Sequence, residues 1–224
     1  MGSRGASSSQ DKASFKNGLK LSDGTEYEFD GTLQYGGKDK YLTGATRGVV
    51  EVWEANRIKN KIEYAYAVRE DGRAIGETKG GKKSVSVPSW YHTTQNSVFT
   101  HIHPRDDKAL LGGTFSKQDL SNFYRYNNKT MRAVAREGTY SISKGKNFDA
   151  NGFSQMITQA DKAFSTNYKT AMNTLNKKFM EGSIDYSNYS KMSSKAFNTA
   201  LVNLHNEYKK NAKKYGYTYT LERR

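Results

Sequence analysis

A strand followed by the start of a helix is encoded in residues 97–119, which contain Ser97-Val-Phe-Thr-His101-Ile-His103-Pro104 and then Ser116-Lys-Gln-Asp119. In a strand, side chains two residues apart point to the same side, so we expect His101 and His103 to present both imidazoles to one point. Asp119, arriving at the start of the next element, could add a carboxylate oxygen. Two nitrogens and one carboxylate leave the fourth position of a zinc ion open for water. The stretch therefore predicts a metal centre suited to hydrolysis.

Simpler interpretations exist for both halves of this stretch. Ser116-Lys-Gln-Asp119 before Leu120 is also a capping box, in which the serine and the acid satisfy backbone groups at a helix start. A His-x-His pair on a strand is often only a hydrogen-bonded or solvated face. What favours the metal is the combined occurrence of paired histidines, a terminating proline, a glycine-bounded loop and a serine/aspartate helix start.

The order His-x-His-Pro and then Ser-x-x-Asp resembles the JAMM (JAB/MPN-plus) metalloprotease family, over roughly residues 50–145. The run Glu63-Tyr-Ala-Tyr-Ala-Val-Arg-Glu-Asp-Gly72 and the Glu137-Gly138 turn resemble the JAB-like domains of bacterial and phage proteins. The resemblance implies that His101, His103 and Asp119 hold Zn²⁺.

The same resemblance implies two catalytic groups besides the ligands. Ser116 would help to stabilise the oxyanion, and a glutamate on an upstream strand would be the general base. We favour Glu63, which stands at the head of a tyrosine and valine alternation, but spacing alone leaves Glu51 and Glu54 open. One departure from the family is the segment Pro104 to Phe115, which is longer than the equivalent segment in the enzymes.

Composition limits the class of protein. At 224 residues without cysteine, the chain can build a sizeable core and has no disulfides, so any metal must be bound by nitrogen and oxygen. No stretch has the roughly 18 consecutive apolar residues of a membrane span. The net charge of +14 predicts an anionic partner, either nucleic acid or an acidic protein, or else a diffuse solvated surface, because the lysines are spread along the chain. We expect a protein of the bacterial cytoplasm, a virion component, or one secreted by a non-classical route.

Periodicity predicts an α+β fold, with strands around a short helix in an α/β sandwich, and a C-terminal helical hairpin. The resemblance implies that the sheet is JAB-like or cytidine-deaminase-like. We expect a disordered leader over residues 1–10, the sheet domain over 11–150, the hairpin over 151–214, and a terminal strand or tail over 215–224. Expected within the sheet domain are short strands in residues 11–60, strands near 62–69, 73–78, 83–87 and 97–103, a helix over 116–127, and a hairpin over 131–143.

Three functions remain open from the sequence. The first is a zinc hydrolase that cleaves a peptide or isopeptide bond of a protein substrate, associated with a phage or mobile element. The second is a basic nuclease or toxin domain that uses the histidines as acid and base. The third is a non-catalytic JAB-like binding scaffold.

Overall fold

The chain builds one mixed sheet with helices on both faces, in a computed structural model that describes residues 13–42, 44–82, 84–86, 88–104 and 107–223. The six-stranded sheet has the order β4-β3-β5-β6-β7-β8, and β1 and β2 form a separate two-stranded sheet. The predicted α+β class is confirmed. The strands are β1 (Ser14–Lys20), β2 (Glu26–Gln34), β3 (Tyr64–Val68), β4 (Ala74–Lys79), β5 (Val98–Ile102), β6 (Thr130–Ala135), β7 (Gly138–Lys144) and β8 (Tyr217–Glu222).

Four α-helices and one short 3-10 helix complete the described chain. They are α1 (Gly44–Arg57), η2 (Ser89–Thr93), α2 (Lys117–Arg125), α3 (Ala150–Met180) and α4 (Tyr186–Asn211). All neighbouring strands of the large sheet are antiparallel except β5 and β6, which are parallel. Parallel neighbours need a crossover connection, and α2 lies in the connection between β5 and β6.

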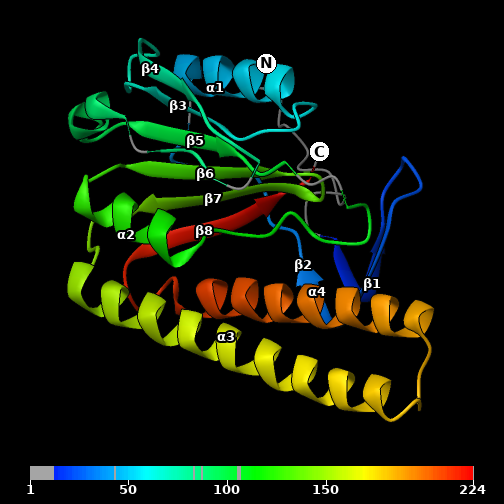
Figure 1. Cartoon of the computed structure of the whole chain (residues 1–224). Helices are drawn as coiled ribbons and strands as arrows, with labels where there is room; N and C mark the ends of the chain where they lie inside the picture. The colour runs from blue at the N-terminus through cyan, green and yellow to red at the C-terminus, as the bar shows by residue number, and fades with distance from the viewer. Residues whose placement is uncertain (1–12, 43, 83, 87, 105–106, 224) are drawn as a thin grey trace, which may run out of the picture.

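The two faces of the sheet have different coverings (Figure 1). Helix α1 packs on one face, where Val50 meets Val68 and Val98, and Trp53 meets Ile102 and Val134. The helix pair and the β1–β2 hairpin lie against the other side of the molecule. Alternation along β5 therefore sends Val98, Thr100 and Ile102 toward α1, and Phe99, His101 and His103 the opposite way.

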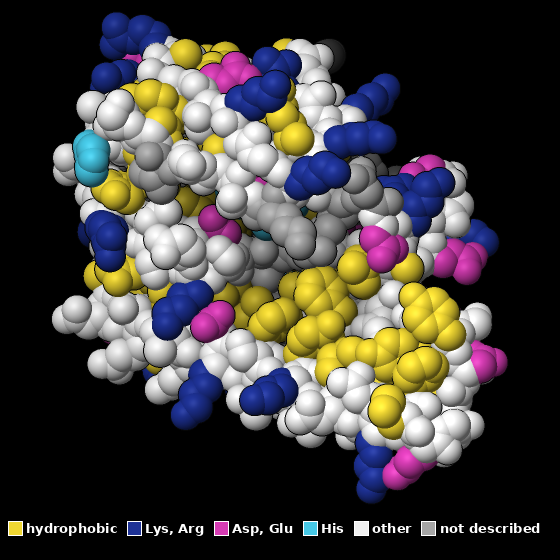
Figure 2. Space-filling model, in the orientation of Figure 1, with side chains coloured by type: hydrophobic (Ala, Val, Ile, Leu, Met, Phe, Trp, Pro, Cys, Tyr) yellow, Lys and Arg dark blue, Asp and Glu magenta, His cyan; other side chains and the backbone are white. Residues whose placement is uncertain are grey.

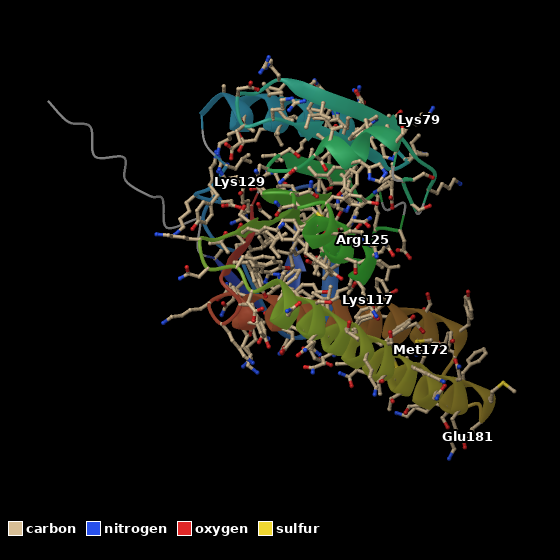
Figure 3. The ribbon with its side chains drawn as sticks, turned by 90° about the vertical axis from the view of Figure 1, so that its left-hand side faces the viewer. Lys79, Lys117, Arg125, Lys129, Met172 and Glu181 are labelled. Carbon is tan, nitrogen blue, oxygen red and sulfur yellow. The ribbon has the colours of Figure 1, made fainter. Side chains whose placement is uncertain are left out.

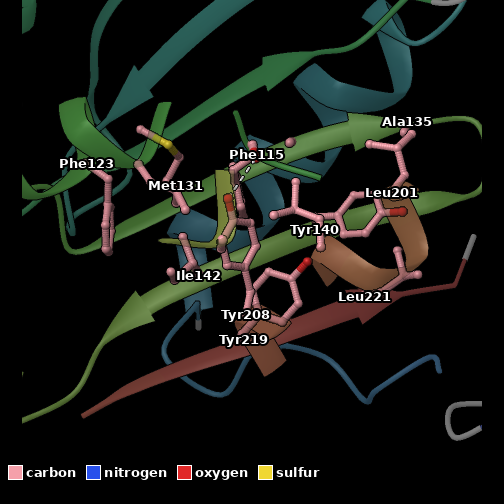
Figure 4. Close-up of a cluster of buried hydrophobic side chains, with 14 of the residues drawn as sticks. Phe115, Phe123, Met131, Ala135, Tyr140, Ile142, Leu201, Tyr208, Tyr219 and Leu221 are labelled. Atoms are coloured by element: carbon pink, nitrogen blue, oxygen red, sulfur yellow. Dashed lines mark hydrogen bonds between the residues drawn. The ribbon is translucent and has the colours of Figure 1, made fainter. Parts of the chain in front are cut away.

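The main core fills the face opposite α1 and joins the sheet to the C-terminal helices. Figure 4 shows Phe115, Met131 and Ile142 among the side chains of Leu201 and Tyr208 from α4. The same cluster includes residues of β2, α2, α3 and β8. The long helices thus pack on the sheet through one continuous apolar interior, and they begin and end close to the predicted boundaries. The division into domains itself stays a prediction.

Two predictions of local structure were wrong. Residues 44–57, expected to contribute short strands, form α1, because Val50 and Trp53, three apart, lie on one helical face that is buried against the sheet. Residues 84–86 form no strand, although a strand near 83–87 was expected; residues 83 and 87 lie outside the described chain. The expected leader at residues 1–10 also lies outside it.

The outer end of the helix pair carries apolar side chains at the surface. Figure 2 shows hydrophobic side chains gathered over this part of the molecule. Among them are Phe179, Met180, Tyr186 and Met192, of which Met180 is 84% exposed. The basic side chains are distributed differently: Figure 3 shows Lys79 at the end of β4, Lys117 and Arg125 at the two ends of α2, and Lys129 just before β6. No helix of the described chain is both long and apolar enough to cross a membrane.

Candidate metal centre

Strand β5 places two histidines on the face opposite α1. His101 pairs with Ala65 of β3 on one side and with Ala133 of β6 on the other, so it sits in the middle of the sheet. Its side chain is buried, while His103, just beyond the strand end, is half-buried. The backbone N–H of His103 donates to Val134 O at 2.8 Å, so the backbone of both histidines is hydrogen-bonded within the sheet.

Asp119 comes to the histidines from the first turn of α2. Ser116 is the N-cap of this helix, and the predicted capping box is present, with Ser116 Oγ accepting from Asp119 N at 3.1 Å. Asp119 Oδ2 in turn accepts from Ser116 N at 2.8 Å and from Ser116 Oγ at 2.6 Å. The capping interpretation and the ligand interpretation are therefore compatible, because the cap holds the carboxylate at the metal position.

The three predicted ligands converge. His101 Nε2 lies 2.8 Å from His103 Nε2 and 3.7 Å from Asp119 Oδ2, and all three ligand atoms lie within 4.8 Å of one another. Two ligand atoms about 2.0–2.1 Å from one zinc ion in tetrahedral geometry are about 3.3 Å apart, a value between the two observed distances. The group could hold a metal ion, and it is the only such cluster in the part of the chain that the structure describes.

Hydrogen bonding decides which imidazole nitrogens face the metal position. His103 Nδ1 lies 3.1 Å from Gly113 O, and a carbonyl can only accept, so Nδ1 carries the proton. When His103 is neutral, its Nε2 offers a lone pair, and the short contact between the two imidazoles then requires that His101 Nε2 donate to it. A metal ion would take the place of this proton.

The charges around the cluster favour a cation. Burial by itself would raise the pKa of Asp119, but His101, His103 and the Ser116 hydroxyl hold that pKa well below its usual range. Burial would lower the pKa of His101, but the carboxylates of Asp119 and Glu63 and the backbone of Arg132 outweigh it and raise the pKa. The ionised carboxylate of Asp119 thus favours a positive charge on the neighbouring imidazole, and a bound metal ion could supply that positive charge instead.

The structure separates the three glutamates that the sequence left open. Ala65 pairs with His101 in antiparallel register, and Glu63 lies two residues before Ala65, so side-chain alternation directs it to the face of the sheet that carries the histidines. Its backbone is held by Gly80 and Gly81, with N–H···O distances of 2.8 Å. The carboxylate is close enough to influence His101 electrostatically.

Glu51 and Glu54 belong to α1, on the other face of the sheet. Glu51 pairs with Arg47 at 2.8 Å. Glu54 is buried and binds Arg132 through both carboxylate oxygens, at 2.7 and 3.0 Å, and it accepts from Thr100 Oγ1 at 2.8 Å. Neither carboxylate faces the histidines.

Arg132 is the centre of a buried ionic network that sequence reasoning missed. Besides Glu54, its guanidinium binds Glu222 Oε1 of β8 at 3.2 Å, and its side chain is 1% exposed. Burial opposes the charge, but the two carboxylates together raise the pKa of Arg132. The available signal was a lone arginine in the apolar run Met131-Arg-Ala-Val-Ala135, which predicts a buried charge with a partner.

The remaining two histidines lie outside the cluster. His92 is exposed in η2, 5.2 Å from the Tyr126 ring between ring centroids. His205 is buried between α4 and β8, with Nδ1 3.0 Å from Tyr219 Oη, so its contacts are with the core.

Comparison of the chain with protein-family models, with curated proteins and with solved structures finds no match.

Proposed function

We propose that this protein is a zinc-dependent hydrolase of the JAMM type that cleaves a peptide or isopeptide bond. The observation that carries the proposal is the convergence of His101, His103 and Asp119 within 4.8 Å, with Glu63 on the same face of the sheet. The donor set is two imidazole nitrogens and one carboxylate, which is typical of catalytic zinc sites that keep one position open.

Each group of the site has a role in this proposal. His101, His103 and Asp119 would hold the ion, which when bound lowers the pKa of a coordinated water toward neutrality and polarises the substrate carbonyl. Glu63 is the general base: it takes a proton from the attacking water and returns it to the leaving amine. Its position at a strand end, half-buried, leaves its carboxylate accessible to a substrate.

Ser116 has two proposed roles that share one hydroxyl. In this structure the hydroxyl proton is directed to Asp119, so Ser116 orients a ligand. Donation to a developing oxyanion, the role implied by the resemblance, requires that this proton turn away from Asp119. The catalytic role of Ser116 stays a prediction.

The first experiment is elemental analysis of untagged protein after zinc is offered, in the parent and in the variant His101→Ala/His103→Ala. We expect about one zinc in the parent and none in the double variant. His92→Ala is the matched control, because it removes an exposed histidine outside the cluster and should retain the metal. Metal retained by the double variant, or absent from the parent, would refute the zinc site.

The second experiment tests the reaction. A screen of peptides and isopeptide-linked substrates should find a cleavage that a chelator stops and that zinc restores. Glu63→Gln should keep the zinc and lose the cleavage, whereas Glu51→Gln should keep both. Zinc binding with no cleavage of any substrate would favour a binding scaffold, and nuclease activity indifferent to chelator would favour the nuclease alternative.

A further inference from the structure

We propose that Glu137 is a positioning residue for the metal ligand His103 and that it acts through the backbone of Gly112 and Gly113. This inference rests on the proposed function, since it concerns the same metal centre. Glu137 lies in the tight turn between β6 and β7, far from the histidines in sequence, and its side chain is buried.

The carboxylate of Glu137 binds the glycine pair through both oxygens. Oε2 accepts from Gly112 N at 2.9 Å, and Oε1 accepts from Gly113 N at 2.8 Å. Tyr140 Oη donates to Oε1 at 3.0 Å. Hydrogen bonds to an ionised acceptor are about twice as strong as neutral ones, so this carboxylate holds two consecutive peptide groups in a fixed orientation.

Those peptide groups determine the orientation of His103. The carbonyl of Gly113 accepts from His103 Nδ1, at 3.1 Å, and this bond leaves Nε2 directed at His101 and Asp119. A ligating histidine is normally oriented in this way by an acceptor at its other nitrogen. Here the acceptor is a loop carbonyl, and the buried carboxylate keeps that loop in place.

The glycines are required for this close approach. A Cβ atom at Gly112 would lie 2.5 Å from Ala135 Cβ and 3.2 Å from Glu137 Oε2. Gly113 has a φ of +87°, a conformation that other residues rarely adopt. Only glycines at both positions let the backbone reach the carboxylate.

Asn198 of α4 holds the preceding part of the same loop. Its Oδ1 accepts from Leu111 N at 2.9 Å, and its Nδ2 donates to Ala109 O at 2.9 Å and to Glu28 O at 3.1 Å. The backbone of residues 109–113 is therefore hydrogen-bonded on two sides, to Asn198 of α4 and to Glu137 of the β6–β7 turn. Residues 109–113 thus form a fixed backbone segment beside His103.

The test is the zinc affinity of Glu137→Gln, measured by competition with a chromogenic chelator. Glutamine has one acceptor oxygen, so one glycine N–H must face an amide donor. We expect the affinity to fall about 10- to 100-fold, the usual effect of losing an outer partner of a ligand. Asp39→Asn is the matched control: it changes a buried carboxylate that accepts from Ser141 and Ser143 on the other face of the sheet, and it should leave zinc affinity unchanged.

A second readout needs no metal and separates this inference from the proposed function. In metal-free protein, ¹⁵N spectra of the imidazoles should show His103 protonated at Nδ1 only, and Glu137→Gln should give a mixture of tautomers. Circular dichroism checks that Glu137→Gln folds. If that variant does not fold, Glu137→Asp is used instead, because its shorter side chain moves the carboxylate away from the glycine N–H groups and keeps the charge. Unchanged His103 signals would overturn the positioning role, even in a parent that binds no zinc. If the parent binds zinc, unchanged zinc affinity would overturn it as well.

Discussion

Replacing Arg132 with methionine should destabilise the protein strongly, because it leaves the buried carboxylate of Glu54 without its cation and Glu222 with Arg47 alone. The side chains of Glu54 and Glu222 are 3% and 9% exposed, and the guanidinium binds them at 2.7–3.2 Å. Removing one partner of a buried pair typically costs about 3–5 kcal/mol, since the remaining charge stays desolvated. We expect this loss for Arg132→Met, although methionine fills a similar volume.

The assay is thermal and urea unfolding followed by circular dichroism at pH 7. For a chain of this length a loss of 1 kcal/mol lowers Tm by about 2–4 °C, so the expected decrease in Tm is roughly 6–20 °C. The control is Glu54→Leu/Arg132→Met, which removes the main ion pair from both sides. Glu222 then keeps Arg47 at 3.7 Å and the N–H of Asp39 at 2.8 Å, so the double variant should recover much of the loss. A single variant within 1 kcal/mol of the parent, or a double variant less stable than the single one, would refute the reasoning.

Three further predictions concern a cap, a glycine and a histidine. Ser116→Ala should lower the free energy of unfolding by about 1 kcal/mol, because α2 loses its N-cap, and unfolding in urea would contradict this if the midpoint did not move. Gly112→Ala should lower the free energy of unfolding by about 1–3 kcal/mol, because the added Cβ clashes with Ala135. The control Gly48→Ala, in a helix with open space around it, should raise that free energy by up to about 1 kcal/mol in the same urea unfolding experiment. Burial, assisted by the nearby lysine Lys209, lowers the pKa of His205 from 6.5 to about 3, so between these values the unfolded chain binds a proton that the folded chain does not. Stability should fall by about 1.4 kcal/mol per pH unit as pH decreases through this window, and His205→Asn should remove that contribution from the pH profile; an unchanged profile would contradict it.

The metal centre and the ionic network use opposite faces of the same two strands. On β5, His101 faces the metal position, while Thr100, one residue earlier, donates to Glu54 on the other side. On β6, Ala133 pairs with His101, and Arg132 anchors α1 and β8. The strand pair therefore carries the candidate ligands on one face and the ionic network on the other, and side chains mounted on strands keep their geometry more precisely than side chains on loops.

Local sequence patterns were sufficient to predict structure where the interactions involved span only a few residues. The histidines at positions 101 and 103 share a face because strand side chains alternate, and Ser116 with Asp119 begins a helix because the cap is satisfied within four residues. The apolar stripes of α3 and α4 have helical spacing over many turns. In contrast, Val49, Val50 and Val52 favour a strand locally, and only burial of Val50 and Trp53 against the sheet makes residues 44–57 a helix.

Alternation and capping act over a few residues, so local sequence is enough to specify the candidate ligand types, their order and the elements that carry them. Which glutamate lies on the side of the histidines depends on long-range contacts, namely the register of β3 against β5 and the side of the sheet that α1 covers. The tertiary structure also brings Glu137 to Gly113 and Arg132 to Glu54, pairs 24 and 78 positions apart in the chain. Such contacts form because buried polar groups must find partners wherever the fold brings them together, and no local pattern records that need.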